Sequence, residues 1–300
     1  MTQRDRFYEL AARALDEDER VEIVLADIGE SAIPPHPRVH NLGIREQLMV
    51  GVAAGLALEG RRAIAHSYAP FLVERPFEML KIDLAHQGVG AVLVSVGASY
   101  DGARSGRTHQ APEDVALVST LPGWTVDVPG HPDEVELAFA DALAVDDPVY
   151  LRLTEEENES AHDGRTLQVV RRGSDEAPFV LAVGPTLDPA LAATAGLDAT
   201  VAYLSRVRPF PAAALRAAVT GVDVLLVEPY LAGTSSAEVA AALSDRPRRL
   251  AALGTQRAEL RRYGTGAEHR AAHGLDAAGI RRSLQAAFAG GALDGQRPAL

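Results

Sequence analysis

Cysteine is absent from all 300 residues of the chain, and lysine is nearly absent. Without cysteine there can be no disulfide, no thiolate metal site and no cysteine nucleophile, so a reducing compartment is allowed. The 41 acidic and 29 basic side chains give a formal net charge of −12. Because nucleic-acid binding needs clustered basic side chains, we expect no nucleic-acid partner.

Long apolar runs and a leader pattern are also absent. The apolar stretch at 48–58 ends at Glu59 and is shorter than the roughly 18 residues that a membrane span requires. The N-terminal residues lack the basic and then apolar segments of a signal peptide. We therefore expect no membrane partner and a cytoplasmic location.

Helical and strand patterns alternate along the first half, which is typical of α/β folds with parallel sheets and helices on both faces. Helical spacing of apolar residues occurs at 4–16, 43–58, 71–86, 114–121 and 132–143. Apolar strand patterns lie between them at 21–26, 63–68, 91–96, 125–128 and 148–153. We predict a first domain over residues 1–154.

A second α/β pattern follows a change in composition. Residues 155–178 begin with glutamates and continue as a polar stretch, so we interpret them as a linker. Strand patterns then occur at 179–183, 200–203, 222–227 and 249–252, and helical patterns near 189–194, 211–219 and 235–243. We predict a second domain over 179–290 and a frayed tail over 291–300.

One carboxylate, Glu46, stands at the start of a helix that has almost no other polar residue. Met49, Val50 and Ala53 follow it on the same helix face, so its side chain should be buried. Burial disfavours the ionised form and favours a carboxyl that shares a proton, for example with a ring nitrogen. The alternative is a pair of Arg45 and Glu46 that only stabilises the first helical turn.

A second candidate is His109, in the sequence Thr108-His109-Gln110. It follows a glycine-containing loop after the strand pattern at 91–96. Such a loop lies at the carboxyl edge of a parallel sheet, where α/β folds bind ligands, and an imidazole can move protons near neutral pH. A surface histidine with no role in chemistry is the alternative.

Together these segments resemble the transketolase family of thiamine diphosphate enzymes. Residues 27–31, 41–60, 71–83 and 108–114 occur in the order and spacing of the family, and 273–276 resembles its C-terminal domain. The resemblance implies two three-layer α/β domains, a parallel pyrimidine-binding sheet followed by the mixed sheet of the transketolase C-terminal domain.

The resemblance also implies cofactor contacts. The glutamate that matches Glu46 hydrogen-bonds N1′ of the aminopyrimidine and drives formation of its imino tautomer. Ile28 matches the apolar residue that supports the bent cofactor. Phe71 and Phe77 match aromatic residues that pack on the pyrimidine, although ordinary core packing explains Phe77 equally well.

The diphosphate end of the cofactor is not accounted for. The family holds it through a metal ion, usually with a Gly-Asp-Gly motif, because Mg²⁺ and Ca²⁺ prefer oxygen ligands. This chain has no Gly-Asp-Gly sequence. The resemblance therefore implies half of a split enzyme, in which an N-terminal subunit carries thiamine diphosphate and Mg²⁺ or Ca²⁺ and the two chains form an α2β2 heterotetramer.

Substrate contacts are implied in the same way. Ser31 matches a hydroxyl that contacts a sugar phosphate, and His109 matches the active-site histidine, a proton donor or oxyanion stabiliser. Family members that act on phosphorylated ketoses have a histidine at the place of Gly97 and an aspartate at the place of Ser105. Both differences predict an unusual substrate.

Glu155 stands where the family has its phosphate-binding arginine, and a carboxylate there repels an anionic group. Arg104 or Arg107 could supply a replacement, because guanidinium groups bind phosphate and carboxylate bidentately. The alternative is that both are solvated loop charges.

Three functions follow. The first is the C-terminal subunit of a two-chain transketolase-like transferase, which cleaves a C–C bond in a ketose, ketose phosphate or 2-oxo donor and passes the fragment to an acceptor. The second is the β subunit of a 2-oxo-acid dehydrogenase decarboxylase. The third is a degenerate regulatory partner without catalysis.

Overall fold

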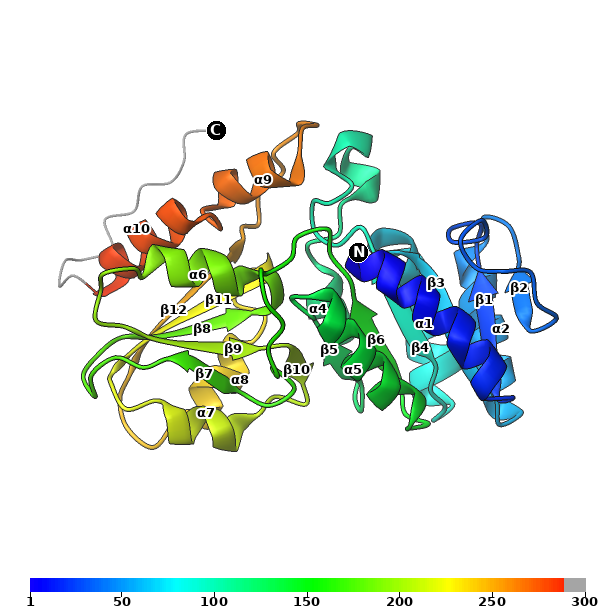
Figure 1. The fold of residues 1–300 in the computed structure, drawn as a ribbon, viewed down its shortest axis with the longest axis horizontal. Helices are drawn as coiled ribbons and strands as arrows, with labels where there is room; N and C mark the ends of the chain where they lie inside the picture. Colours follow the sequence, from blue (N-terminus) through cyan, green and yellow to red (C-terminus); the bar gives the residue numbers. More distant parts are fainter. Residues whose placement is uncertain (289–300) are drawn as a thin grey trace.

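The computed structural model describes residues 1–288, so the frayed tail expected at 291–300 lies outside the described residues. Two α/β domains lie side by side (Figure 1). Within the described residues, no helix is long and apolar enough to cross a membrane. The strands of the first domain are β1 (Val21–Leu25), β2 (Val39–Asn41), β3 (Arg62–Tyr68), β4 (Val92–Val96), β5 (Thr125–Asp127) and β6 (Val149–Arg152).

Helices cover both faces of this first sheet (Figure 1). Phe7 and Leu10 of α1 pack with Phe139 of α5 on one face, and Met49 of α2 and Leu72 of η1 pack on the other. The helical segments are α1 (Gln3–Glu17), α2 (Glu46–Leu58), η1 (Pro70–Glu74), α3 (Phe77–Met79), η2 (Leu80–His86), η3 (Ala103–Ser105), η4 (Arg107–His109), α4 (Asp114–Val118) and α5 (Pro132–Leu143).

The second domain has strands and helices in similar alternation. Its strands are β7 (Gln168–Arg171), β8 (Phe179–Val183), β9 (Thr200–Leu204), β10 (Arg206–Arg208), β11 (Asp223–Leu231) and β12 (Arg249–Thr255). Its helical segments are η5 (Gly184–Thr186), α6 (Leu187–Ala193), α7 (Ala212–Ala218), α8 (Ser236–Ala242), α9 (Gly266–His273) and α10 (Ala277–Phe288).

The sheet orders confirm the predicted fold class. The first sheet runs β10-β5-β6-β4-β3-β1-β2, and β10 is its antiparallel strand. The second runs β12-β11-β8-β9-β7, and β7 pairs antiparallel with β9, which makes this sheet mixed. Strand β7 comes from within the segment 155–178 that we interpret as a linker.

The helix expected over 71–86 is divided into shorter segments. Pro76 has no backbone N–H, and its ring would clash with the carbonyl four residues earlier in a continuous α-helix. The chain accommodates it with wide turns, in which Arg75 N donates to Pro70 O at 3.0 Å. The break gives residue 75 a partly exposed position beside α2.

The two domains are joined by more than their connecting segment. Strand β10 leaves the second domain and pairs with β5 of the first, and Arg206 Nε donates to Asp127 Oδ1 at 2.9 Å. One hydrophobic cluster also continues from Val118 and Val126 to Val207 and Tyr230. The short polar pattern of β10 gave no sequence signal for this exchange.

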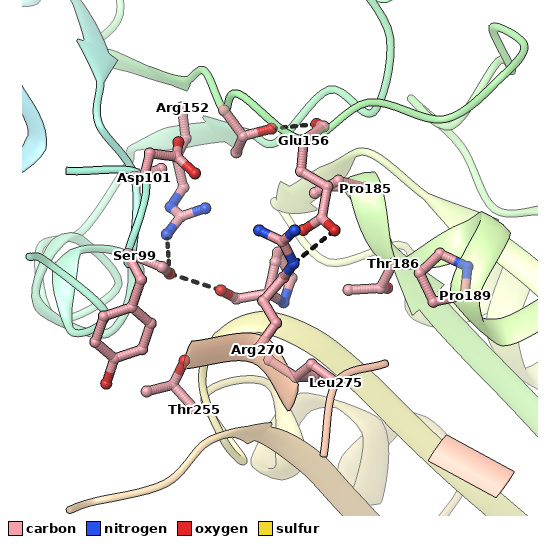
Figure 2. Close-up of a pocket in the computed structure, with 14 residues that line it drawn as sticks. Ser99, Asp101, Arg152, Glu156, Pro185, Thr186, Pro189, Thr255, Arg270 and Leu275 are labelled. Carbon is pink, nitrogen blue, oxygen red and sulfur yellow. Dashed lines mark hydrogen bonds and ion pairs between the residues drawn. The ribbon is translucent and has the colours of Figure 1, made fainter. Parts of the chain in front are cut away.

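Charged side chains from both domains help to line a pocket between them (Figure 2). Arg152, at the end of β6, is fully buried and donates to Ser99 Oγ at 2.6 Å. Ser99 donates in turn to the carbonyl of Pro229 in β11 at 2.6 Å. Arg270 of α9 completes the contact with an ion pair to Glu156 at 2.6 Å. These bonds fix the position of the loop that follows β4.

Candidate functional site

Glu46 is the first residue of α2, and only 2% of it is exposed. Its Oε1 accepts a hydrogen bond from Arg75 Nη1 at 2.8 Å. The alternative pair with Arg45 does not form, since Arg45 donates to the carbonyl of Leu42 at 2.8 Å. Glu46 is thus buried beside Met49. The expectation of an apolar environment for its carboxylate is wrong, because the interruption of the helix at Pro76 brings Arg75 to it.

Aromatic rings connect this carboxylate to His109. The Arg75 guanidinium carbon lies 4.2 Å from the centroid of the Phe71 ring. The Phe71 ring meets the His109 ring edge-on at 5.0 Å, and the Tyr68 ring lies 6.2 Å from Phe71 and 5.8 Å from His109. Glu46 and His109, which are far apart in sequence, therefore belong to one cluster.

This cluster lies at the carboxyl edge of the first sheet. Tyr68 ends β3, and the loop that carries His109 follows β4, the parallel neighbour of β3. Carboxyl ends of parallel strands are where α/β folds bind ligands. The His109 ring nitrogen Nδ1 lies 3.0 Å from Thr108 Oγ1, which orients the imidazole.

The turns after β1 carry Ile28 and Ser31 to the same edge. Ile28 is half-buried and Ser31 is exposed. Asn41 fixes this loop, because its Oδ1 accepts hydrogen bonds from the amides of Asp27 at 3.0 Å and Gly43 at 3.1 Å. Within residues 1–288, no hydrogen bond joins the Ser31 side chain to another residue.

Phe77 follows Pro76 and lies in a different helical segment from Phe71. It belongs to the short helix α3 and is partly buried against the hydrophobic core. No ring pairing joins it to Phe71 in the part of the chain that the structure describes. Its position is consistent with core packing, whereas Phe71 is joined to Glu46 through Arg75.

The two candidate arginines differ in their surroundings. Arg107 donates to Glu113 and to Glu259, both at 3.0 Å, and to the carbonyl of Gln110 at 2.7 Å. These contacts already occupy most of its donors. Arg104 is exposed on η3 and has no ion pair within residues 1–288. Neither Arg104 nor Arg107 lines the cavity beside Tyr68, whose ring lies against His109.

That cavity contains a residue that sequence analysis missed. A space of about 300 Å³ is lined by Arg4 together with Thr2, Tyr68, Val96, Gly97, Leu153, Thr154 and Glu155. Arg4 Nε donates to Tyr8 Oη at 2.8 Å, and its guanidinium carbon lies 5.9 Å from the Tyr68 ring centroid. No salt bridge to Arg4 forms among the described residues. No sequence pattern indicated Arg4, because its neighbour Tyr68 is distant in the chain.

Glu74 is a second residue that the sequence did not reveal. It ends η1, three residues after Phe71, and its buried Oε1 has no hydrogen-bond partner among residues 1–288. Burial, together with the nearby charge of Glu113, raises the pKa of Glu74 to about 7. A carboxyl in that condition exchanges its proton near neutral pH.

The geometry fits one end of the expected cofactor. A buried carboxylate beside an aromatic ring at a sheet edge can bind a planar, nitrogen-containing ring. Among residues 1–288, no group of three or more His, Asp or Glu side chains is arranged to hold a metal ion. Glu46, Phe71 and Ile28 are therefore the residues that could contact the pyrimidine half.

Comparison with known proteins is consistent with this geometry. Residues 1–159 match the pyrimidine-binding domain of transketolase. The chain is 30% identical over 244 residues to a 6-deoxy-6-sulfo-D-fructose transketolase subunit of Clostridium sp. strain MSTE9, over 75% of each chain. The chain therefore belongs to the transketolase family, as the sequence resemblance implies, and corresponds to its C-terminal portion.

Two further proteins are similar to this chain over most of its length. An uncharacterised 33.6 kDa protein from the fasciation locus of Rhodococcoides fascians is 47% identical over 282 residues, which is 90% of each chain. The solved β4 tetramer of a split-gene transketolase, described as inactive, shares the fold with a TM-score of 0.82, at 23% identity over 96% of this chain and 99% of that one.

Proposed function

We propose that this protein is the C-terminal subunit of a two-chain, thiamine diphosphate-dependent transketolase-like enzyme. It would cleave a C–C bond beside a carbonyl in a ketose or 2-oxo donor and transfer the fragment to an acceptor. The observation that carries the proposal is the buried Glu46 carboxylate, in one cluster with Phe71 and His109 at the carboxyl edge of the sheet.

The roles of the residues follow from their chemistry. When bound, the cofactor supplies the nucleophilic carbon and the electron sink. Glu46 would hold a proton at the pyrimidine ring nitrogen, because a buried carboxyl readily shares one. Phe71 and Ile28 would orient the ring. His109 would donate a proton to a substrate oxygen or stabilise negative charge on it.

The substrate would bind in the cavity beside Tyr68. Arg4 is available there for an anionic group, while Glu155 on the same cavity disfavours a second one. This arrangement favours a donor with a single anionic group and with hydroxyls that donate hydrogen bonds to Glu155. Ser31 and Arg104, at the sheet edge and the exposed loop, remain candidates for the distal end of the substrate.

The partner would be an N-terminal subunit that holds the diphosphate and its Mg²⁺ or Ca²⁺. One face of α2 exposes apolar side chains, since Leu48 is 48% and Leu58 is 59% exposed. Ile44, just before the helix, is 71% exposed, and Ile82 of η2 is 43% exposed. Exposed apolar patches of this kind are typical of subunit interfaces and support an α2β2 assembly.

One observation favours a regulatory partner without catalysis. The Glu46 carboxylate is engaged by Arg75, and a catalytic carboxyl would be free to share a proton. Nothing in the geometry favours the dehydrogenase alternative specifically.

A pair of variants tests the proposed function. The Glu46→Ala chain, assembled with the partner subunit, should lose about 10²–10⁴-fold in cofactor-dependent turnover, the range for loss of general acid–base catalysis. Glu59→Ala, which alters an exposed carboxylate after the same helix, is the matched control and should keep full activity. Full turnover by the Glu46→Ala complex would exclude the mechanism.

A further inference from the structure

Arg75 contacts both Glu46 and Phe71, the two residues predicted to bind the pyrimidine ring. Its Nη1 donates to Glu46 Oε1 at 2.8 Å, and its guanidinium carbon lies 4.2 Å from the centroid of the Phe71 ring. We propose that Arg75 is a positioning residue that takes the place of the pyrimidine ring in the chain without cofactor and must turn away before Glu46 can act. This inference rests on the proposed function.

The shapes of the two groups support a competition. A guanidinium is planar and presents neighbouring N–H donors to a carboxylate, and it stacks on aromatic faces. An aminopyrimidine is also planar and presents an amino group beside a ring nitrogen. Either group can satisfy Glu46 and lie against Phe71, but both cannot use the same carboxylate oxygen and the same ring face.

The two states also differ in charge. A guanidinium at hydrogen-bond distance stabilises the ionised carboxylate. A carboxyl that shares a proton with a ring nitrogen needs the opposite preference. The Glu46–Arg75 pair therefore describes a resting state, and the working state requires the pair to separate.

Arg75 can leave without disturbing the core. Its side chain is 40% exposed, and Glu46 is its one hydrogen-bond partner among residues 1–288. It lies between η1 and α3, directly before Pro76, where the regular α-helix is interrupted. Exposed arginine side chains reorient readily, so a bound ring could displace it.

The test is the affinity of the assembled two-chain complex for thiamine diphosphate, measured by equilibrium dialysis. Arg75→Met keeps an apolar side chain over Phe71 but removes the competing donors, so we expect the dissociation constant to fall about tenfold. Arg75→Gln, a second neutral variant, should lower it in the same direction. Arg61→Met is the matched control, because Arg61 is 45% exposed, lies 3.9 Å from Glu22 and donates to the carbonyl of Glu19 at 3.0 Å, with no contact to Glu46 or Phe71 among residues 1–288.

The direction of the change separates the possible outcomes. A merely structural arginine, once removed, would weaken cofactor binding or leave it unchanged, and either result for both neutral variants would overturn the inference. Tighter binding by both, with Arg61→Met unchanged, would establish it. If the wild-type complex fails to bind thiamine diphosphate, the proposed function itself is wrong and the inference falls with it.

Discussion

Tyr68 fills the space into which a side chain on residue 97 would project. A Cβ atom at Gly97 would come within 2.2 Å of Tyr68 Cδ1, and Gly97 has a φ of +68°. The ring that takes this space also contacts Phe71 and His109 edge-on. A tyrosine from β3 therefore forms the wall that a longer side chain at the end of β4 would otherwise form.

The first prediction separates this close approach from backbone strain. Gly97→Ala should lower the free energy of unfolding by about 3 kcal/mol, since it combines a left-handed conformation with overpacking against Tyr68. Gly123→Ala is the matched control, because Gly123 has a φ of +77° but no atom near its Cβ position. It should cost only about 1 kcal/mol. Urea unfolding of both variants measures the difference.

A double variant completes this test. In a Tyr68→Ala chain the ring is absent, so adding Gly97→Ala should cost no more than Gly123→Ala costs in the wild-type chain. Equal effects of Gly97→Ala with and without the Tyr68 ring would contradict the proposed contact between the two residues.

The second prediction concerns Arg4. Arg4→Met in the assembled enzyme should raise KM for an anionic donor at least tenfold and leave the thiamine diphosphate dissociation constant unchanged, because Arg4 lines the cavity proposed for the substrate and has no contact with Glu46 or Phe71 among residues 1–288. Arg13→Met, on the same helix and paired with Glu136 at 3.6 Å, is the control and should change neither value. If Arg4→Met instead weakened the binding of thiamine diphosphate, Arg4 would belong to the cofactor site and not to the proposed substrate cavity.

Most of the sheet could be predicted from the sequence, because long apolar strands and periodic helices carry strong local signals. The expected strand at 179–183 coincides with β8, and the expected helix at 132–143 coincides with α5. The short strands β2, β7 and β10 could not be predicted. They have few apolar residues, and their stability comes from neighbouring strands that lie far away in the sequence.

The site shows the same division. The position of Glu46 could be predicted from the apolar residues that follow it on one helix face, and that of His109 from the loop after a strand. The ion pair with Arg75 and the cavity around Arg4 depend on contacts between separate elements, which no spacing rule reports. Tertiary placement therefore decides which charges surround the predicted residues.

The third prediction uses the carboxyl groups between the domains. Burial raises the pKa of Asp101 to about 7, although Arg152 and the amide of Glu155 act in the opposite direction. A carboxyl whose pKa is higher in the folded chain stabilises it at low pH, and this contribution is lost as the pH rises through about 4 to about 7. Asp101→Asn should make the decline in unfolding free energy shallower, by up to about 1.4 kcal/mol per pH unit.

Asp163→Asn serves as the comparison for this pH series. A hydrogen bond from Arg165 lowers the pKa of Asp163, and the Asp163 side chain is largely exposed. Removal of this carboxyl should therefore leave the slope of unfolding free energy against pH unchanged between pH 4 and 7. Parallel curves for wild type and Asp101→Asn would show that Asp101 does not take up a proton on folding.

The fourth prediction concerns the exposed face of α2. Leu48→Glu should abolish assembly with the partner subunit, because it places a charge on the apolar face proposed as the interface. It should leave the thermal stability of the isolated chain nearly unchanged, since Leu48 is 48% exposed there. Leu137→Glu is the matched control. Leu137 is 44% exposed on α5, which covers the opposite face of the sheet, and its replacement should not affect assembly.

Size-exclusion chromatography with light scattering distinguishes the two faces. If the interface includes α2, the Leu48→Glu chain elutes apart from its partner at every concentration tested, while Leu137→Glu forms the full complex. The opposite result would place the interface on the side of α1 and α5. Glu46 begins the same helix as Leu48, so an interface on α2 would bring the partner subunit directly beside the buried carboxylate.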